Sequence, residues 1–121
     1  MRDHRKLRAF ELADSLALLT YQRTAGFPRS ELFGLTTQMR RAAVSAASNI
    51  VEGCARESFT EYIRFLDIAY ASACELQYQI SLAARLEYLT AEHANELSAM
   101  AIDTSKVLNA LLRALRTQPD G

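Results

Sequence analysis

Apolar positions recur every three or four residues along most of this 121-residue chain. From Cys54 to Gln118 there is no glycine or proline, and a stretch of this kind rich in alanine, leucine and glutamate is typical of helix. Eight apolar residues step by alternating threes and fours and therefore share one helical face: Phe59, Tyr62, Leu66, Ala69, Ala73, Leu76, Ile80 and Ala83. The periodicity predicts an all-α protein.

Start and stop signals divide the chain into four helices, expected at about residues 7–25, 36–53, 58–87 and 90–116. Because the apolar register continues past residue 87, periodicity alone also allows one helix from the third region to the end of the fourth. The charged Glu87 and a helix-start signal at residues 90–92 favour a break. Residues 1–121 then form a single domain, an antiparallel up-down-up-down four-helix bundle.

The expected helix ends follow from residues with special backbone or capping properties. We predict that Gly26 takes a left-handed C-terminal position after the first helix and that Pro28 prevents its continuation. Thr36 is the predicted N-cap of the second helix, which we expect to end at Gly53. Ser58, with a glutamate three residues later, predicts a capping box for the third helix.

The segment 62–70 is apolar at every position except Arg64 and Asp67. A bundle helix that is apolar on several sides requires a neighbour beyond its own chain, and we therefore expect self-association into a homo-oligomer. The alternative is that this helix is central and buried by the other three. The expected oligomer interface consists of Tyr62, Phe65 and Ile68.

The second helix combines small apolar residues with a polar edge. Small side chains allow a close helix–helix approach, and Asn49 on the seam fixes register or oligomeric state at a cost in stability. If the second and third helices fold back about Arg56, Glu75 meets Gln38 or Arg41. We interpret the polar residues as a structural network, with a ligand site formed by Asn49, Glu52 and Glu75 as the alternative. The network consists of Gln38, Arg41, Asn49, Glu52 and Glu75.

Charge argues against a strongly basic protein, since 14 Lys and Arg residues balance 14 Asp and Glu residues and the pI is about 6.7. A surface that follows phosphates normally has a net positive charge. An up-down bundle nevertheless brings both termini to one end, where cations gather into a candidate nucleic-acid contact or an ordinary solvated fringe. These cations are Arg2, Arg5, Lys6, Arg8, Arg113 and Arg116.

Catalytic and metal-binding motifs are not found in the sequence. The Glu-x-x-His pairs of di-iron bundles, a Cys-x-x-Cys pair, a nucleophile elbow and a glycine-rich phosphate loop are all missing, so we expect no catalytic residue, metal or cofactor. Catalysis would have to depend on Glu52 and Glu75 alone. Cys54 and Cys74 are expected to be reduced and far apart. With no secretory or membrane-spanning apolar stretch, a cytoplasmic protein is expected.

One long string of residues resembles a known family. The matching positions are Phe27-Pro28, Glu31-Leu32-Phe33-Gly34-Leu35-Thr36, Gln38, Arg40-Arg41-Ala42-Ala43, Ser45, Asn49-Ile50-Val51-Glu52-Gly53, Phe65-Leu66, Ile68-Ala69, Ser72 and Glu75-Leu76. The chain resembles four-helix-bundle proteins encoded within intervening sequences of bacterial 23S ribosomal RNA genes. Phe10 stands where many relatives carry Trp, and Ala71 stands where a glycine often precedes the serine.

The resemblance implies a ring-like homopentamer without catalytic activity. It also extends to an accessory protein of diversity-generating retroelements, a basic pentamer that engages nucleic acid and a reverse transcriptase. We therefore expect a non-enzymatic homo-oligomeric scaffold whose surface binds RNA or a nucleic-acid-processing partner. The alternatives are a protein–protein adaptor without nucleic-acid binding and, more remotely, a carboxylate enzyme using Glu52 and Glu75.

Overall fold

Four long helices make up most of the computed structural model, which describes residues 2–119. The elements are α1 (Arg8–Thr24), α2 (Leu35–Ala55), α3 (Phe59–Arg85) and α4 (Ala91–Arg116). Single 3-10 turns, η1 (His4–Lys6) and η2 (Arg29–Glu31), precede α1 and α2. The prediction of an all-α protein with four helices is confirmed.

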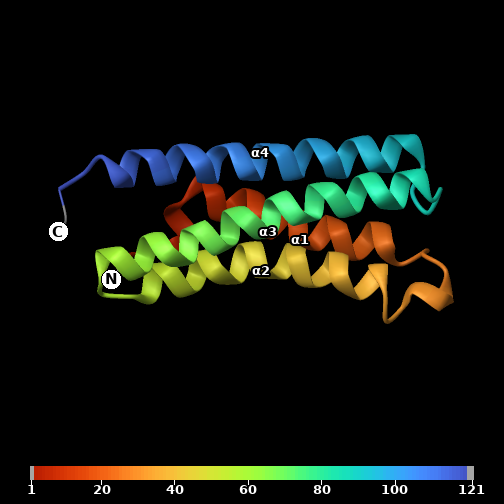
Figure 1. The fold of residues 1–121 in the computed structure, drawn as a ribbon, viewed down its shortest axis with the longest axis horizontal. Helices are drawn as coiled ribbons and strands as arrows, with labels where there is room; N and C mark the ends of the chain where they lie inside the picture. The colour runs from red at the N-terminus through yellow and green to blue at the C-terminus, as the bar shows by residue number, and fades with distance from the viewer. Residues whose placement is uncertain (1, 120–121) are drawn as a thin grey trace.

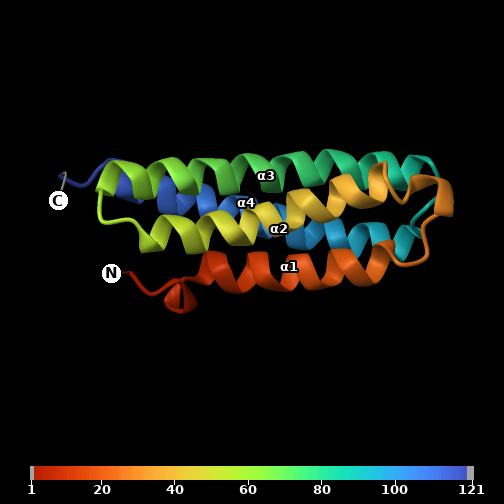
Figure 2. The same cartoon turned by 90° about the horizontal axis from the view of Figure 1, so that it is seen from below.

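The helices lie side by side, and successive connections occur at opposite ends of the molecule (Figures 1 and 2). α2 packs against α1 and α3, and α4 packs against α3 and α1. The segment before α1 and the C-terminal end of α4 therefore lie at one end of the molecule, beside the α2–α3 turn (Figure 1). The α1–α2 connector and the α3–α4 turn lie together at the other end.

The core runs along the axis between the helices. Near the connector end it is centred on Leu16, Met39, Leu76 and Leu97, one residue from each helix. Near the terminal end it contains Ala13, Ile50, Leu66, Leu108 and Leu112. Because each helix supplies apolar residues on its inner side to both halves, the apolar seam recognised in the sequence is the buried face.

A left-handed residue separates α3 from α4. Glu87 has a φ of 63°, and its N–H donates to the Ala84 carbonyl at 3.0 Å while the Tyr88 N–H donates to the Ala83 carbonyl at 2.9 Å. This is the Schellman arrangement, which ends a helix and satisfies its last carbonyls. Thr90 then caps α4 by accepting the His93 N–H at 3.1 Å. The single long helix that periodicity also allows is therefore not formed.

The N-terminus of α3 forms only half of the predicted capping box. Ser58 Oγ accepts the Glu61 N–H at 3.2 Å, which confirms Ser58 as the N-cap. The Glu61 carboxylate instead accepts from Arg64 Nε at 2.8 Å. The side chain thus forms an ion pair one turn along the helix.

The predicted N-cap of α2 is wrong. Gly34 is the N-cap residue, and the carboxylate of Glu31 accepts the Leu35 N–H at 3.1 Å. Thr36 lies inside the first turn, where its hydroxyl is buried without a hydrogen-bond partner. The Glu31 carboxylate, supplied by the preceding 3-10 turn, occupies the free Leu35 N–H in place of the Thr36 hydroxyl. A carboxylate is also favoured at the positive end of the helix dipole.

Two predicted roles for glycine are also wrong. Gly26 is not left-handed, since no glycine among residues 2–119 has a positive φ. Gly53 does not end α2, which continues to Ala55. A Cβ on Gly53 would lie 3.0 Å from Phe65 Cβ and 3.2 Å from the Tyr62 carbonyl oxygen. Gly53 therefore allows α3 to approach α2 closely.

Candidate interaction surfaces

The N-terminal segment is held against the α2–α3 turn by Arg2. Its Nη1 donates to the Arg56 carbonyl at 2.7 Å, and its guanidinium carbon lies 4.0 Å from the centre of the Tyr62 ring. A cation at the carbonyl end of α2 is favourable for the helix dipole. Arg2 therefore has a packing role in addition to any contact that it makes with a partner.

Most of the remaining cations predicted to contact nucleic acid are paired within the chain. Three ion pairs each join one of these arginines to an acidic residue at the terminal end of the molecule. They are Arg5 with Asp3 at 3.0 Å, Arg8 with Glu11 at 3.6 Å, and Arg116 with Asp67. The hydrogen bond from Arg5 lowers the pKa of Asp3. Within residues 2–119, Lys6 and Arg113 form no ion pair. The structure thus gathers the predicted cations at one end but neutralises several of them.

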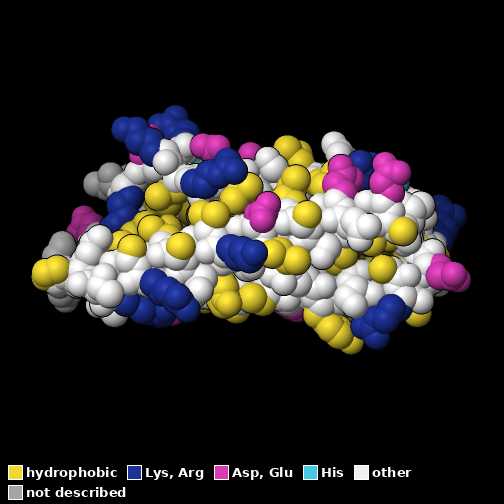
Figure 3. Space-filling model, turned by 90° about the horizontal axis from the view of Figure 1, so that it is seen from above, with side chains coloured by type: hydrophobic (Ala, Val, Ile, Leu, Met, Phe, Trp, Pro, Cys, Tyr) yellow, Lys and Arg dark blue, Asp and Glu magenta, His cyan; other side chains and the backbone are white. Residues whose placement is uncertain are grey.

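The face formed by α4 with its neighbours shows the same mixture. In Figure 3, Lys and Arg side chains alternate with Asp and Glu side chains along the molecule, and hydrophobic groups reach the surface between them. A nucleic-acid backbone would meet both signs of charge on this face. Its electrostatic attraction would therefore come from individual unpaired cations.

A small polar chain joins α2 to α3. Ser45 Oγ and Ser72 Oγ are 2.8 Å apart, and Asn49 Nδ2 donates to the Ser45 carbonyl at 2.8 Å and to its Oγ at 3.0 Å. Asn49 thus bonds Ser45, and Ser45 in turn contacts Ser72, whereas none of these bonds includes the other four residues of the predicted network. The signal in the sequence was that Ser45 lies on the polar edge of the second helix, while Ser72 directly precedes Ala73 of the third-helix seam.

The predicted tie from Glu75 to Arg41 or Gln38 is wrong. Among residues 2–119, no hydrogen bond or ion pair joins them, and Glu75 instead accepts from Gln79 at 3.4 Å. The contact between Ser45 and Ser72 centres the hairpin near residues 58–59 rather than at Arg56. Arg41 and Gln38 are exposed, so neither gains from a buried partner.

Glu52 is likewise separate from the serine chain. It pairs with Arg56 at 3.2 Å, one turn along the same helix. Gly53, the next residue, meets Phe65, and Glu75 lies ten residues further along α3, a rise of about 15 Å. Glu52 and Glu75 therefore do not share a site.

The predicted oligomer interface on α3 is wrong for two of its three residues. Tyr62 is 4% exposed and Phe65 is 9% exposed within the single chain. Arginine side chains cover the outer faces of both rings: Arg2 lies over Tyr62, and Arg56 and Arg64 lie over Phe65 at 4.8 and 4.6 Å. Ile68 alone is exposed, to 37%. Stacked guanidinium groups thus replace the second chain that the apolar pattern had suggested.

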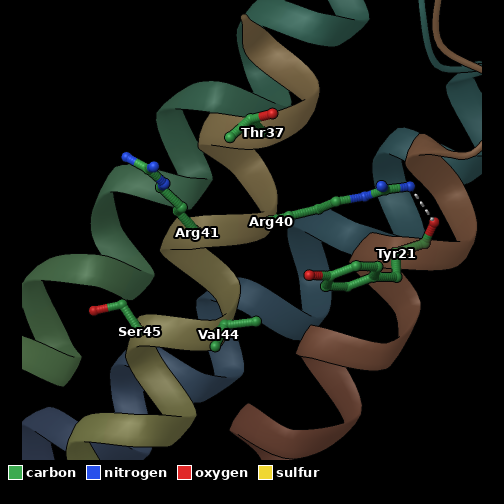
Figure 4. Close-up of a pocket in the computed structure, with 6 residues that line it drawn as sticks. All are labelled: Tyr21, Thr37, Arg40, Arg41, Val44 and Ser45. Atoms are coloured by element: carbon green, nitrogen blue, oxygen red, sulfur yellow. Dashed lines mark hydrogen bonds between the residues drawn. The ribbon is translucent and has the colours of Figure 1, made fainter. Parts of the chain in front are cut away.

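An open groove lies beside Tyr21 of α1 and along the outer face of α2. Its cavity volume is about 510 Å³, and its lining residues are Tyr21, Thr37, Arg40, Arg41, Val44 and Ser45. Figure 4 shows Arg40 reaching across to the Tyr21 backbone while Arg41 points away from it. The Arg40 guanidinium lies 4.5 Å from the Tyr21 ring centre, and its Nε donates to Thr24 Oγ1 at 2.9 Å. The groove therefore has a fixed, partly aromatic wall.

Exposed apolar side chains extend this groove into a larger patch. Tyr21 and Val44 are exposed at its edges, and Leu18, one turn before Tyr21 on α1, is 62% exposed. Sequence reasoning placed Tyr21 on the apolar stripe of the first helix and gave Leu18 and Val44 no role. Leu18 beside Tyr21 makes the apolar surface of α1 wider than one buried face accommodates, and this width was the available signal.

The connector before α2 carries the most exposed large apolar side chain. Phe33 is 92% exposed. Glu31 holds the connector at both carboxylate oxygens, accepting from the Leu35 N–H at 3.1 Å and from the Tyr88 hydroxyl at 2.9 Å. Both bonds lower the pKa of Glu31, and the bond from the Leu35 N–H is the larger cause. The bond to Glu31 raises the pKa of the Tyr88 hydroxyl. Phe33 is thus exposed on a connector that is itself fastened.

The two thiols differ in their surroundings. Cys54 is buried beneath the terminal end and Cys74 is partly buried in α3, and both are free. Burial raises the pKa of the Cys54 thiol. Among the described residues, no group of three or more His, Cys, Asp or Glu side chains is placed to hold a metal ion. The helices of this part of the chain also include none that is long and apolar enough to cross a membrane.

The fold defines the class of the protein as all-α, built from four helices. The chain belongs to the 23S rRNA-intervening sequence protein family, whose model matches residues 5–110. The fold is similar to a crystal structure of a protein of unknown function from the S23 ribosomal protein family of Bacteroides thetaiotaomicron VPI-5482. That match has a TM-score of 0.80 and 23% identity, and covers 87% of this chain and 95% of that one. A comparison with curated proteins gave no match.

Proposed function

We propose that the protein is a non-enzymatic scaffold whose up-down-up-down bundles assemble into a ring-like homo-oligomer, a pentamer by family resemblance. The observation that carries the proposal is the apolar surface of the α1–α2 side, which includes Leu18, Tyr21, Val44 and the nearly fully exposed Phe33. Exposed large apolar side chains that gather on one side of a molecule often mark interfaces. Two free thiols favour a cytoplasmic location for this assembly.

The arrangement of carboxylates supports a non-enzymatic role. Glu52 pairs with Arg56 and Glu75 accepts from Gln79, and the two carboxylates are separated by about 15 Å along the molecule. Paired acid–base chemistry requires two carboxyl groups that flank one substrate. The remote alternative of a carboxylate enzyme therefore has little geometric support.

Sedimentation velocity with light scattering tests the assembly. At micromolar protomer concentration we expect a discrete species several times the 13.5 kDa protomer, and five times that mass for the pentamer. A single sharp species at 13.5 kDa across the concentration range would refute the scaffold proposal. A discrete mass other than five protomers would refute the pentamer alone.

RNA binding at the terminal end is a second candidate function. Lys6 and Arg113 are exposed, and neither forms an ion pair within the described residues. An oligomer would repeat these cations around its axis and raise the local positive charge. Titration of single-stranded RNA at low and high salt, with Lys6→Glu/Arg113→Glu as the comparison, tests this function. No binding at low salt would favour the protein–protein adaptor alternative.

A further inference from the structure

Phe33 combines near-complete exposure with a fixed position. Its side chain is 92% exposed, whereas the connector around it is held by the two bonds to Glu31 and by the Thr37 hydroxyl, which donates to the Leu32 carbonyl. A rigid segment loses little conformational freedom when it binds. An apolar side chain presented in this way is suited to enter a cavity on another molecule.

The groove between α1 and α2 has the properties that a phenyl ring requires. Its cavity volume of about 510 Å³ exceeds the lower limit of small-molecule sites, and the Tyr21 ring and Val44 provide apolar walls. Arg40 is already stacked on Tyr21, whereas the exposed Arg41 forms no ion pair within residues 2–119. A guanidinium at the rim can lie over an inserted aromatic ring.

We propose that Phe33 of one copy inserts into the α1–α2 groove of the next copy. This inference rests on the homo-oligomeric function proposed above and names the contact that builds the assembly. The occupant is a second copy because one chain carries both complementary features, a protruding ring and a groove bordered by exposed apolar side chains. Phe33 precedes the first turn of α2 and does not fill the groove of its own chain.

The placement of the two features determines the kind of assembly. Phe33 lies at the end of α2, whereas Val44 lies about nine residues into the helix, a rise of roughly 14 Å. A contact that joins two different patches is heterologous, so each copy both donates a ring and receives one. Such a contact repeats from copy to copy and closes into a ring when its rotation closes. Leu18 and Leu32 lie beside the two features and would enlarge the apolar centre of the interface.

The first experiment compares Phe33→Ala with Leu86→Ala by sedimentation velocity. Both side chains are exposed at the connector end, but only Phe33 belongs to the proposed contact. We expect Phe33→Ala to weaken association by about 30-fold or more, the effect of a central interface residue, while Leu86→Ala leaves it unchanged. Far-UV circular dichroism and thermal unfolding should show that both variants remain folded.

The second experiment changes the receiving groove. Val44→Glu places a carboxylate on its apolar wall without altering Phe33, and we expect it to dissociate the assembly as Phe33→Ala does. In a third variant, Phe33→Trp, the indole is the only tryptophan of the chain. Its emission should shift to the blue as protomer concentration rises, and Val44→Glu in the same background should abolish the shift.

The outcomes separate the two proposals. A monomeric wild type would overturn the scaffold function and this contact together. An oligomeric wild type whose affinity is unchanged by Phe33→Ala or by Val44→Glu would overturn the contact and leave the scaffold function standing. Water-exposed emission from Phe33→Trp in an intact oligomer would have the same meaning.

Discussion

Replacing Gly53 by alanine has two opposite effects on stability: alanine has the higher helix propensity, but its Cβ must fit into a tight contact between α2 and α3. An alanine inside a helix is favoured over glycine by about 1 kcal/mol. The new Cβ, however, would lie 3.0 Å from Phe65 Cβ and 3.2 Å from the Tyr62 carbonyl oxygen. Both atoms are fixed to the α3 backbone and cannot rotate away, so α3 must move. Overpacking of this kind costs about 1–3 kcal/mol.

The packing cost is expected to exceed the gain in helix propensity, because the atoms that approach Gly53 are backbone and Cβ atoms on the first turns of α3. With the gain of about 1 kcal/mol subtracted, we expect Gly53→Ala to lower the free energy of unfolding by up to about 2 kcal/mol, which for a chain of this length corresponds to a fall in Tm of up to about 7 °C. Urea unfolding followed by far-UV circular dichroism measures this change. The protomer concentration must be the same for all variants, since association adds to apparent stability.

Gly26→Ala is the matched control. No heavy atom lies within 4 Å of the Cβ that alanine would add there, and Gly26 has no positive φ. The variant should therefore be neutral or stabilised by up to about 1 kcal/mol, through the unfolded state. A Gly53→Ala protein as stable as Gly26→Ala would refute the close approach of α3 to α2 as the reason for the glycine.

Three further predictions concern other parts of the fold. Glu87→Gly should raise stability by about 0.5–1 kcal/mol in urea unfolding because glycine accepts the φ of 63° without strain, whereas Glu87→Ala should not. The pKa of Glu31 is lowered on folding, so its stabilising contribution is present above the ordinary glutamate pKa and is lost as the pH falls through the folded value. The stability advantage of wild type over Glu31→Gln should therefore shrink between about pH 6 and about pH 3, and an advantage independent of pH would contradict this. In the native protein Cys74 should react with a thiol reagent faster than Cys54, whose buried thiol has a raised pKa, and equal rates before unfolding would contradict the burial of Cys54.

The sequence was informative wherever structure depends on neighbours along the chain. Apolar periodicity predicted the helical fold, start and stop signals divided it into four helices, and the hydroxyl groups of Ser58 and Thr90 marked two N-termini correctly. These features depend on a few consecutive residues, which is why a single sequence suffices to find them.

Features that depend on tertiary contacts could not be predicted in the same way. Gly53 reads as a helix end until the position of Phe65 is known, and Glu31 caps α2 only because the 3-10 turn brings its carboxylate to Leu35. The Ser45–Ser72 contact likewise depends on the register of the α2–α3 hairpin. The residue type indicated that each position has a particular structural role, but the role itself depends on the residues that lie next to it in space.

Arginines cover the aromatic rings of α3 but not that of the connector, which bears on where the proposed assembly surface lies. On α3, the apolar segment expected to require a second chain is covered by its own protomer, because Arg56 and Arg64 lie over the Phe65 ring. At the connector no arginine covers Phe33, which stays 92% exposed. The exposed apolar surface therefore lies mainly on the α1–α2 side of the molecule and not at Tyr62 and Phe65 of α3, where the sequence pattern had placed it. Substitutions on that side, rather than at Tyr62 or Phe65, should separate assembly from folding, since removing a buried ring would destabilise the protomer itself.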